Sequence, residues 1–145
     1  NVNSSEITKL ENNINLNPDE QFQFALDLLM ARKFDQAILS LQEFIKNNKE
    51  SEFSGSAHYW LGEIYILKKE HREAALILAE GFQKYPNSVK APDMLYKLGN
   101  SLVVIEKISE ACNTFTKFSK EYSDHKLIEK TNKKITDLAC PISVE

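Results

Sequence analysis

The two cysteines, Cys112 and Cys140, carry the most reactive side chains of this sequence. Two cysteines are too few for a disulfide framework, and these two lie too far apart in sequence for a zinc-binding pair. Three interpretations stay open: a buried free thiol at Cys112 beside Ala111, a disulfide between the two cysteines, and a reactive thiol. The helices expected to carry them run antiparallel, which would bring the two ends together, and a disulfide would require an oxidising compartment. No histidine lies near either cysteine in sequence, which disfavours the reactive thiol.

The three histidines show no pattern typical of a metal or catalytic site. His58, His71 and His125 fall in different predicted elements, and none lies four residues from another histidine as in a zinc-binding helix. The four glycines form neither a phosphate-binding loop nor a Gly-x-Ser-x-Gly elbow. We therefore expect no catalytic residues, no metal and no cofactor.

Composition narrows the function classes further. The chain has 145 residues and a net charge of −3, and its eighteen Lys and Arg residues are scattered, unlike the basic footprint of a nucleic-acid binder. No apolar run approaches the ~20 residues that span a bilayer. We expect neither nucleic-acid binding nor membrane insertion. Because the sequence starts at Asn1 and not at Met, we interpret it as a processed or trimmed product that can have lost an export signal.

The chain is a short array of copied units, because three segments superimpose at an offset of 37 residues. Small residues align first, then alanines twelve positions later, then bulky apolar residues four positions further on: Ala25, Gly62 and Gly99; Ala37, Ala74 and Ala111; Leu41, Leu78 and Phe115. Repeats of this length cannot close a core alone, so each packs on its neighbour. The pattern predicts an all-α fold, a right-handed solenoid of three helical hairpins plus a C-terminal capping helix. Such a concave surface typically binds a partner and performs no chemistry.

We expect one repeat domain over residues 19–139, between two short ends. Residues 1–18 are rich in Asn and Ser and are interpreted as a linker or frayed segment, and residues 140–145 as a tail. The expected units are about 19–54, 55–91 and 92–124, followed by a capping helix at 125–139 that has no partner copy.

Three further features locate helix ends and helix contacts. Pro18 and Asp19 suit the start of the first helix. The polar stretch from Asn47 to Ser56 predicts a turn, with the first helix of the second unit starting at His58. The glycines at 62 and 99 would each cost about 1 kcal/mol in a helix interior relative to alanine, so their recurrence indicates close approach of two helices.

The order of a small residue, an alanine twelve positions later and a bulky residue four beyond resembles the tetratricopeptide repeat. That repeat usually has a period of about 34 residues. The longer period here predicts three extra residues in the second helix of each unit or in the turn after it.

Longer strings carry a more specific resemblance. Ala57–Glu63 (AHYWLGE), Tyr85–Asp93 (YPNSVKAPD) and Leu98–Gly99 are similar to the C-terminal domain of the YbgF/CpoB family of Tol-Pal-associated cell division coordinators, over about residues 20–139. Two stretches depart from the family pattern: Asn47–Ser51 replaces a Tyr-Pro-type turn, and Ile105–Ile108 lacks a Gly-Asp-Tyr-type turn.

The resemblance implies a periplasmic protein whose signal has been cleaved and whose repeat domain binds a TolA segment. It also implies links to a peptidoglycan synthase and its activator, and an upstream coiled coil that makes the parent protein trimeric. Without that coiled coil we expect this chain to be monomeric.

In tetratricopeptide folds the first helix of each unit lines the groove, which implies a partner-binding set in this chain. The expected residues are Phe22, Leu26, Leu29, Met30, Tyr59, Glu63, Ile66, Tyr96, Asn100 and Val103. The aromatic residues Phe22, Tyr59 and Tyr96 recur at one position, as a ladder for a partner or as ordinary packing between repeats. Trp60 is expected in the core or in the packing between repeats.

Two other surface features leave alternatives open. Lys126, Lys130, Lys133 and Lys134 are predicted to share a helix face that is either solvated or a docking patch for an acidic partner. A generic tetratricopeptide adaptor that captures chaperone C-termini would need Lys or Arg in the groove, whereas the expected groove is aromatic and aliphatic with Glu63. A scaffold for a cell-wall enzyme remains a further alternative.

Overall fold

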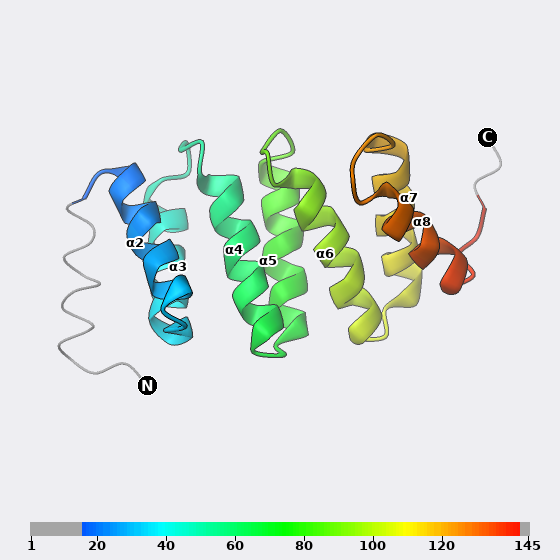
Figure 1. Ribbon diagram of the computed structural model, residues 1–145, viewed down its shortest axis with the longest axis horizontal. Helices are drawn as coiled ribbons and strands as arrows, with labels where there is room; N and C mark the ends of the chain where they lie inside the picture. The colour runs from blue at the N-terminus through cyan, green and yellow to red at the C-terminus, as the bar shows by residue number, and fades with distance from the viewer. Residues whose placement is uncertain (1–15, 143–145) are drawn as a thin grey trace.

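The computed structural model describes residues 16–142, and all regular secondary structure in that range is helical (Figure 1). The helices are α2 (Pro18–Met30), α3 (Phe34–Asn47), α4 (Ser54–Leu67), α5 (His71–Lys84), α6 (Ala91–Val104), α7 (Ile108–Glu121) and α8 (Ile128–Asp137). Each helix packs against the next one along the chain. The predicted all-α helical-repeat solenoid is confirmed. None of the helices in this range is long and apolar enough to cross a lipid bilayer.

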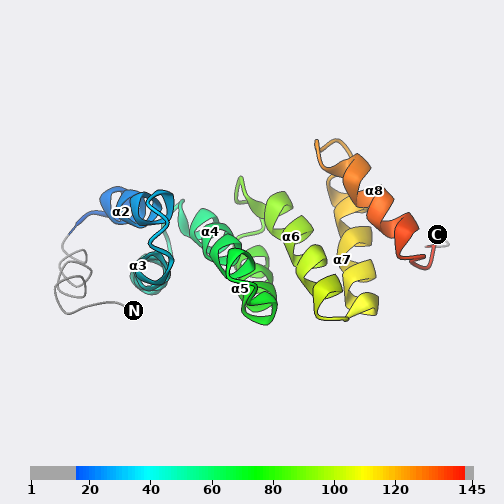
Figure 2. The same cartoon turned by 60° about the horizontal axis from the view of Figure 1, so that its bottom comes forward.

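The helices lie in two rows (Figure 2). The first helices of the units, α2, α4 and α6, form one row together with α8, and the second helices, α3, α5 and α7, form the other. Helix α4 also contacts α6, whereas no comparable contact joins α5 to α3 or to α7. Closer approach within the first row is the geometry of the inner side of a curved solenoid.

The turns repeat as faithfully as the helices. Three residues join the two helices of a unit, and six join one unit to the next, so the longer turn follows the second helix. In each short turn one residue adopts a left-handed backbone conformation, namely Arg32 (φ 59°), Lys69 (φ 62°) and Glu106 (φ 63°). The following N–H then bonds back into the first helix, for example from Glu70 to the Tyr65 carbonyl at 2.8 Å. This cap ends the first helix and reverses the chain.

Helix α8 corrects the expectation of a capping helix without a partner copy. It begins at Ile128, 37 residues after the start of α6 at Ala91. A left-handed residue, Ala139 (φ 52°), again ends it. Residue 139 follows Glu106 by 33 positions, so α8 occupies the place of the first helix of a fourth unit, one helical turn short. Thr136 stands where the small residue Gly99 is in α6, and this change hid the relation from the repeat pattern.

The turn before α8 repeats the earlier ones with different side chains. The Leu127 N–H donates to Nδ1 of His125 at 3.0 Å. In the preceding turns Ser51 and Ser88 hydroxyls accept the corresponding N–H bonds, at 3.1 and 3.2 Å. The turn at Asn47–Ser51, which departs from the family sequence, therefore adopts the same hydrogen-bonded form.

One predicted helix start was wrong by a few residues, whereas the predicted start at Pro18 is confirmed. Helix α4 begins at Ser54, four residues before the predicted start at His58, so Gly55 lies in a helix and not in a turn. A Cβ at Gly55 would overlap Ser88 and approach Tyr85, so the next turn packs directly on it. Helix α2 begins at Pro18 with a capping box from Asn17, which falls within the expected linker. The rest of that linker, residues 1–15, and tail residues 143–145 lie outside the described part of the chain.

The core consists of the small-to-bulky contacts that the repeat pattern predicts. A Cβ added at Gly62 would lie 2.5 Å from Leu78, and one added at Gly99 would overlap the ring of Phe115. Leu78 and Phe115 are fully buried, as are Ala74 and the other aligned alanines. The expected close approach of the two helices of a unit is confirmed.

Replacing Gly99 by Ala should lower the free energy of unfolding by about 1–2 kcal/mol, because the buried Phe115 ring has no room to move. That value is the net loss, because the cost of overpacking should exceed the gain in helix propensity, which is about 1 kcal/mol. In urea unfolding, the double variant Gly99→Ala/Phe115→Leu should lose less than the sum of the two single losses. A Gly99→Ala protein more stable than wild type would contradict this packing.

Candidate functional site

The outward side of the first helices forms a repeated surface, which we call the first-helix stripe. Positions spaced i, i+4, i+7 and i+11 share one helix face. They are Asp19, Ser56 and Asp93; Gln23, Trp60 and Lys97; Leu26, Glu63 and Asn100; Met30, Leu67 and Val104. None of these twelve residues is buried. The stripe therefore offers a continuous surface across three units.

One edge of the stripe is apolar. Met30, Leu67 and Val104 are each the last residue of a first helix, and they are 82%, 57% and 55% exposed. A single exposed apolar residue is ordinary on a protein surface. A row of three at equivalent positions indicates a contact surface.

The middle of the stripe is polar, and some of its charged side chains are paired with other groups of the protein. Lys97 Nζ lies 3.3 Å from Glu63 Oε1, so an ion pair joins α6 to α4. Lys90 Nζ lies 4.8 Å from the ring centroid of Tyr59 and 5.4 Å from that of Trp60. Both lysines are therefore engaged within the molecule. Oδ1 of Asn100, in contrast, has no hydrogen-bond partner among residues 16–142.

The aromatic residues proposed as a ladder mostly pack inside the solenoid. Phe22 is 9% exposed, and its ring centroid lies 5.1 Å from that of Phe53. Tyr59 is 8% exposed. Burial, with help from the carboxylate of Glu63, raises the pKa of the Tyr59 hydroxyl. Tyr96 is half-buried, with its ring centroid 6.0 Å from that of Phe115. For Phe22 and Tyr59 the structure supports the packing interpretation.

The other residues of the expected set divide between stripe and core. Leu29, Ile66 and Val103 are half-buried and pack against the hydrophobic clusters between helices. Leu26, Met30, Glu63 and Asn100 lie on the stripe.

The expected set left out several stripe residues. Gln23, Trp60 and Lys97 lie three positions before Leu26, Glu63 and Asn100, so helical spacing from those residues could have found them. Leu67 and Val104 are the repeat equivalents of Met30. Trp60 is half-buried and packs against two hydrophobic clusters, as expected for packing between repeats, and its position on α4 also places it on the stripe.

Three of the four lysines predicted on one face of the last helix, Lys130, Lys133 and Lys134, lie within α8 at i, i+3 and i+4 and so share a face. Lys126 precedes the start of α8 at Ile128, and Lys134 is half-buried. Lys133 Nζ lies 2.8 Å from Asp137 within the same helix. Whether this face is only solvated or is a docking patch for an acidic partner stays a prediction.

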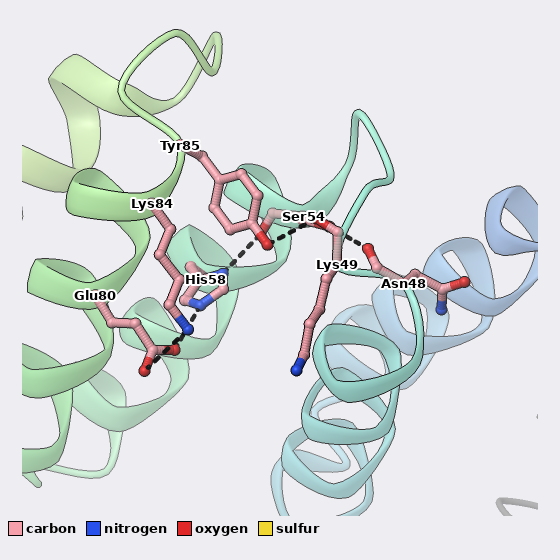
Figure 3. A network of polar contacts seen from close by, with 7 residues as sticks. All are labelled: Asn48, Lys49, Ser54, His58, Glu80, Lys84 and Tyr85. Atoms are coloured by element: carbon pink, nitrogen blue, oxygen red, sulfur yellow. Dashed lines mark hydrogen bonds and ion pairs between the residues drawn. The ribbon is translucent and has the colours of Figure 1, made fainter.

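A polar network closes the junction between the first and second units (Figure 3). The Tyr85 hydroxyl donates to the Lys49 carbonyl at 2.9 Å, and the Ser54 hydroxyl donates to the Asn48 carbonyl. Asn48 Nδ2 in turn donates to Gln21 at 2.6 Å. The two turns at this edge of the solenoid are thus tied to the helices on both sides.

His58 is the buried centre of this network, and it is fully shielded from solvent. Its Nδ1 lies 2.7 Å from the Ser54 carbonyl, which can only accept, so Nδ1 carries a proton. Its Nε2 lies 2.8 Å from the carboxylate of Glu80 (Figure 3). Glu80 also lies 3.8 Å from Lys84. With both ring nitrogens occupied, His58 holds helices α4 and α5 together.

The remaining histidines have separate surroundings. Nδ1 of His125 accepts the turn hydrogen bond from Leu127, and Nδ1 of His71 is buried with no hydrogen-bond partner in the described part of the chain. Within the described chain no three His, Cys, Asp or Glu side chains are grouped in a way that could hold a metal ion.

The structure joins Cys112 and Cys140 in a disulfide. Cys112 lies in α7, and Cys140 follows the end of α8, so the bond ties the shortened helix to the last complete unit. Thr131 is the only residue of α8 that is buried. A helix with so little buried surface depends on its covalent tie.

Comparison with known proteins supports the repeat assignment. Residues 56–88 and 93–125 match the tetratricopeptide-repeat family. Two curated proteins named cell division coordinator CpoB, both from Pseudomonas putida, are 37% identical to this chain over 47 residues. That stretch covers 32% of this chain and only 18% of each relative. The matched residues thus support two tetratricopeptide repeats, a class of protein-interaction module, and α2 and α3 repeat the same hairpin ahead of them.

Replacing Glu80 by Ala should lower the free energy of unfolding by about 1–3 kcal/mol, because it leaves the buried Nε2 of His58 without an acceptor. Replacing Lys84 by Ala is the matched control, since it removes only an exposed ion pair and should change stability by less than about 0.5 kcal/mol. Urea unfolding measures both. Equal effects of the two substitutions would show that the His58 contact contributes nothing.

Reducing the disulfide should lower the free energy of unfolding by about 3–4 kcal/mol, the entropy model's value for closing a loop of this length. Hydrogen exchange in α8 should accelerate, because the helix has few other anchors. A Cys112→Ala/Cys140→Ala variant should not respond to the reductant. Thiol titration of the unfolded, unreduced protein should find no free thiol, and finding two would exclude the bond.

Proposed function

We propose that this chain is the partner-binding module of a periplasmic cell division coordinator, and that the first-helix stripe is its binding surface. The observation that carries the proposal is the exposed apolar row of Met30, Leu67 and Val104 beside polar groups on the inner row of helices. The CpoB proteins of Pseudomonas putida, which are named cell division coordinators, support the cellular role.

The surface suits a partner helix or extended segment with one apolar side. Three apolar side chains at one edge would bury the apolar side of the partner, and the half-buried Trp60 adds an aromatic side chain on the same face, two helical turns from Leu67. The buried amide oxygen of Asn100 has no hydrogen-bond partner among residues 16–142, so a donor of the partner that reached it would satisfy it.

The partner proposed is a segment of TolA, in line with the family resemblance of the sequence. Through it the module would link outer-membrane constriction to septal peptidoglycan synthesis, with a peptidoglycan synthase and its activator as further partners. In this role the chain is non-catalytic and monomeric, and a coiled coil elsewhere in the parent protein would supply trimerisation. The Cys112–Cys140 disulfide agrees with an oxidising compartment such as the periplasm.

The chaperone-adaptor alternative receives no support from the stripe. Capture of a C-terminal carboxylate needs basic side chains free to bind it. Lys97 is paired with Glu63, and Lys90 lies over two aromatic rings.

Replacing Leu67 by Glu should weaken binding of a purified TolA fragment at least tenfold, because it places a charge in the apolar row. Leu39→Glu is the matched control: it changes the same residue type, 41% exposed against 57%, on the opposite row of helices. Isothermal titration calorimetry measures both, with circular dichroism to verify the fold. Equal weakening by both variants, or no binding by the wild-type chain, would overturn the proposal.

A further inference from the structure

The second helices enclose two hollows on the face opposite the stripe. The first hollow, of about 340 Å³, lies between α3 and α5 with Leu61 of α4 at its base. The second, of about 420 Å³, lies between α5 and α7 with Leu98 of α6 at its base. Leu61 and Leu98 are 37 residues apart, so these are repeat-equivalent positions. The pair of hollows is therefore built by the stacking of the units.

Two substitutions between the repeats make the second hollow different in chemistry. In the first hollow, Gln42 Nε2 lies 3.3 Å from the Tyr65 hydroxyl, so a polar bridge spans the space. The equivalent positions in the second hollow are Ala79 and Leu102. Shorter and apolar side chains leave the second hollow wider, unbridged and lined mainly by aliphatic groups.

The wall between the two hollows is an exposed leucine. Leu76 lines both hollows and is 73% exposed. Beside it, Ala75 and Leu102 are buried and form part of the inner surface of the second hollow. An exposed Leu next to an open apolar hollow is an apolar surface, and covering it with a partner would lower the free energy.

Charges at the mouth of the second hollow indicate what kind of partner would cover it. Arg72 and Lys107 line the hollow, and neither side chain forms an ion pair or a hydrogen bond with another of residues 16–142. Glu110 is the acidic residue of this lining. The first hollow instead has Lys46 with two carboxylates. The mouth of the second hollow thus carries a net positive charge, and the mouth of the first hollow carries a net negative charge.

We propose that the second hollow, with Leu76 and the cations Arg72 and Lys107, is a docking site for a second protein partner. The partner would present an aliphatic or aromatic side chain flanked by carboxylates. The apolar side chain would enter the hollow over Leu98 and Leu102, and the carboxylates would pair with the two cations. Because this face is opposite the first-helix stripe, the module could hold two partners at once.

A second copy of the chain fits this face less well. Arg72 lies one helical turn before Leu76 on α5. Inserting Leu76 of one copy into the hollow of another would bring the Arg72 of the first copy toward the basic mouth of the second. Like charges brought together at an interface cost binding free energy. Charge complementarity therefore favours an acidic partner.

The test uses the whole chain and a designed probe. The probe is an amphipathic peptide of about 20 residues, long enough to form a helix, with Leu along one face and Glu beside it. A peptide with Lys in place of Glu is its control. In ¹⁵N-labelled protein, the acidic peptide should shift the amide signals of residues 75–79 and 98–107. The Lys peptide should bind at least tenfold more weakly. Added salt should weaken the binding of the acidic peptide.

Two double variants sharpen the test. Ala79→Gln/Leu102→Tyr installs the side chains of the first hollow. It should weaken the binding of the acidic peptide at least tenfold, while the circular dichroism spectrum stays unchanged. Gln42→Ala/Tyr65→Leu makes the reciprocal change in the first hollow and should leave the affinity unchanged.

Three outcomes would overturn the proposal: no binding of the acidic peptide, signal shifts confined to the first-helix stripe, or equal effects of the two double variants. Dimerisation of the free chain in sedimentation, abolished by Ala79→Gln/Leu102→Tyr, would assign the hollow to a second copy instead. The Leu67→Glu variant should bind the acidic peptide like wild type, so failure here and failure of the stripe proposal are distinguishable.

Discussion

A bulky side chain of each second helix seated on a small residue of the first helix is the contact on which this solenoid depends. Leu78 fills the space that a side chain at Gly62 would need, and Phe115 does the same at Gly99. Because these side chains are closely packed and leave no free space, they set the distance between the two helices of each unit and their relative rotation. The rotation in turn decides which residues of the first helix face outward, so the binding stripe is a consequence of core packing.

The repeat units differ in sequence at positions outside the contact between the bulky and the small residue. Gln42 and Tyr65 bridge one hollow, whereas Ala79 and Leu102 leave its equivalent open and apolar. The polar junction around His58 likewise belongs to one unit boundary, since the repeat equivalents of His58 are Gln21 and Leu95. A solenoid of similar units can therefore present two faces of different chemistry, with binding capacity on both.

Equivalence in structure was partly hidden in the sequence because hydrogen-bond acceptors are interchangeable. The hydroxyls of Ser51 and Ser88 and the ring nitrogen of His125 accept the same turn hydrogen bond. Sequence similarity therefore fades at the last turn while its geometry persists, and α8 looked like an unrelated cap. The sequence left the role of the aromatic residues open for a related reason: helical spacing places Phe22 and Tyr59 on the first helices, but burial depends on the neighbouring helix, which spacing does not describe.

The amino-acid sequence by itself determined the helical hairpins, their period and their small-to-bulky contacts, because these follow from local helix periodicity and from volumes that recur every 37 residues. Only the tertiary structure decided which of three interpretations holds for Cys112 and Cys140, since their pairing requires the end of α8 to meet α7. It also decided that Leu67 is exposed while Tyr59 is buried, although both lie in α4. Exposure is a property of what the adjacent units cover, and a single helix does not encode it.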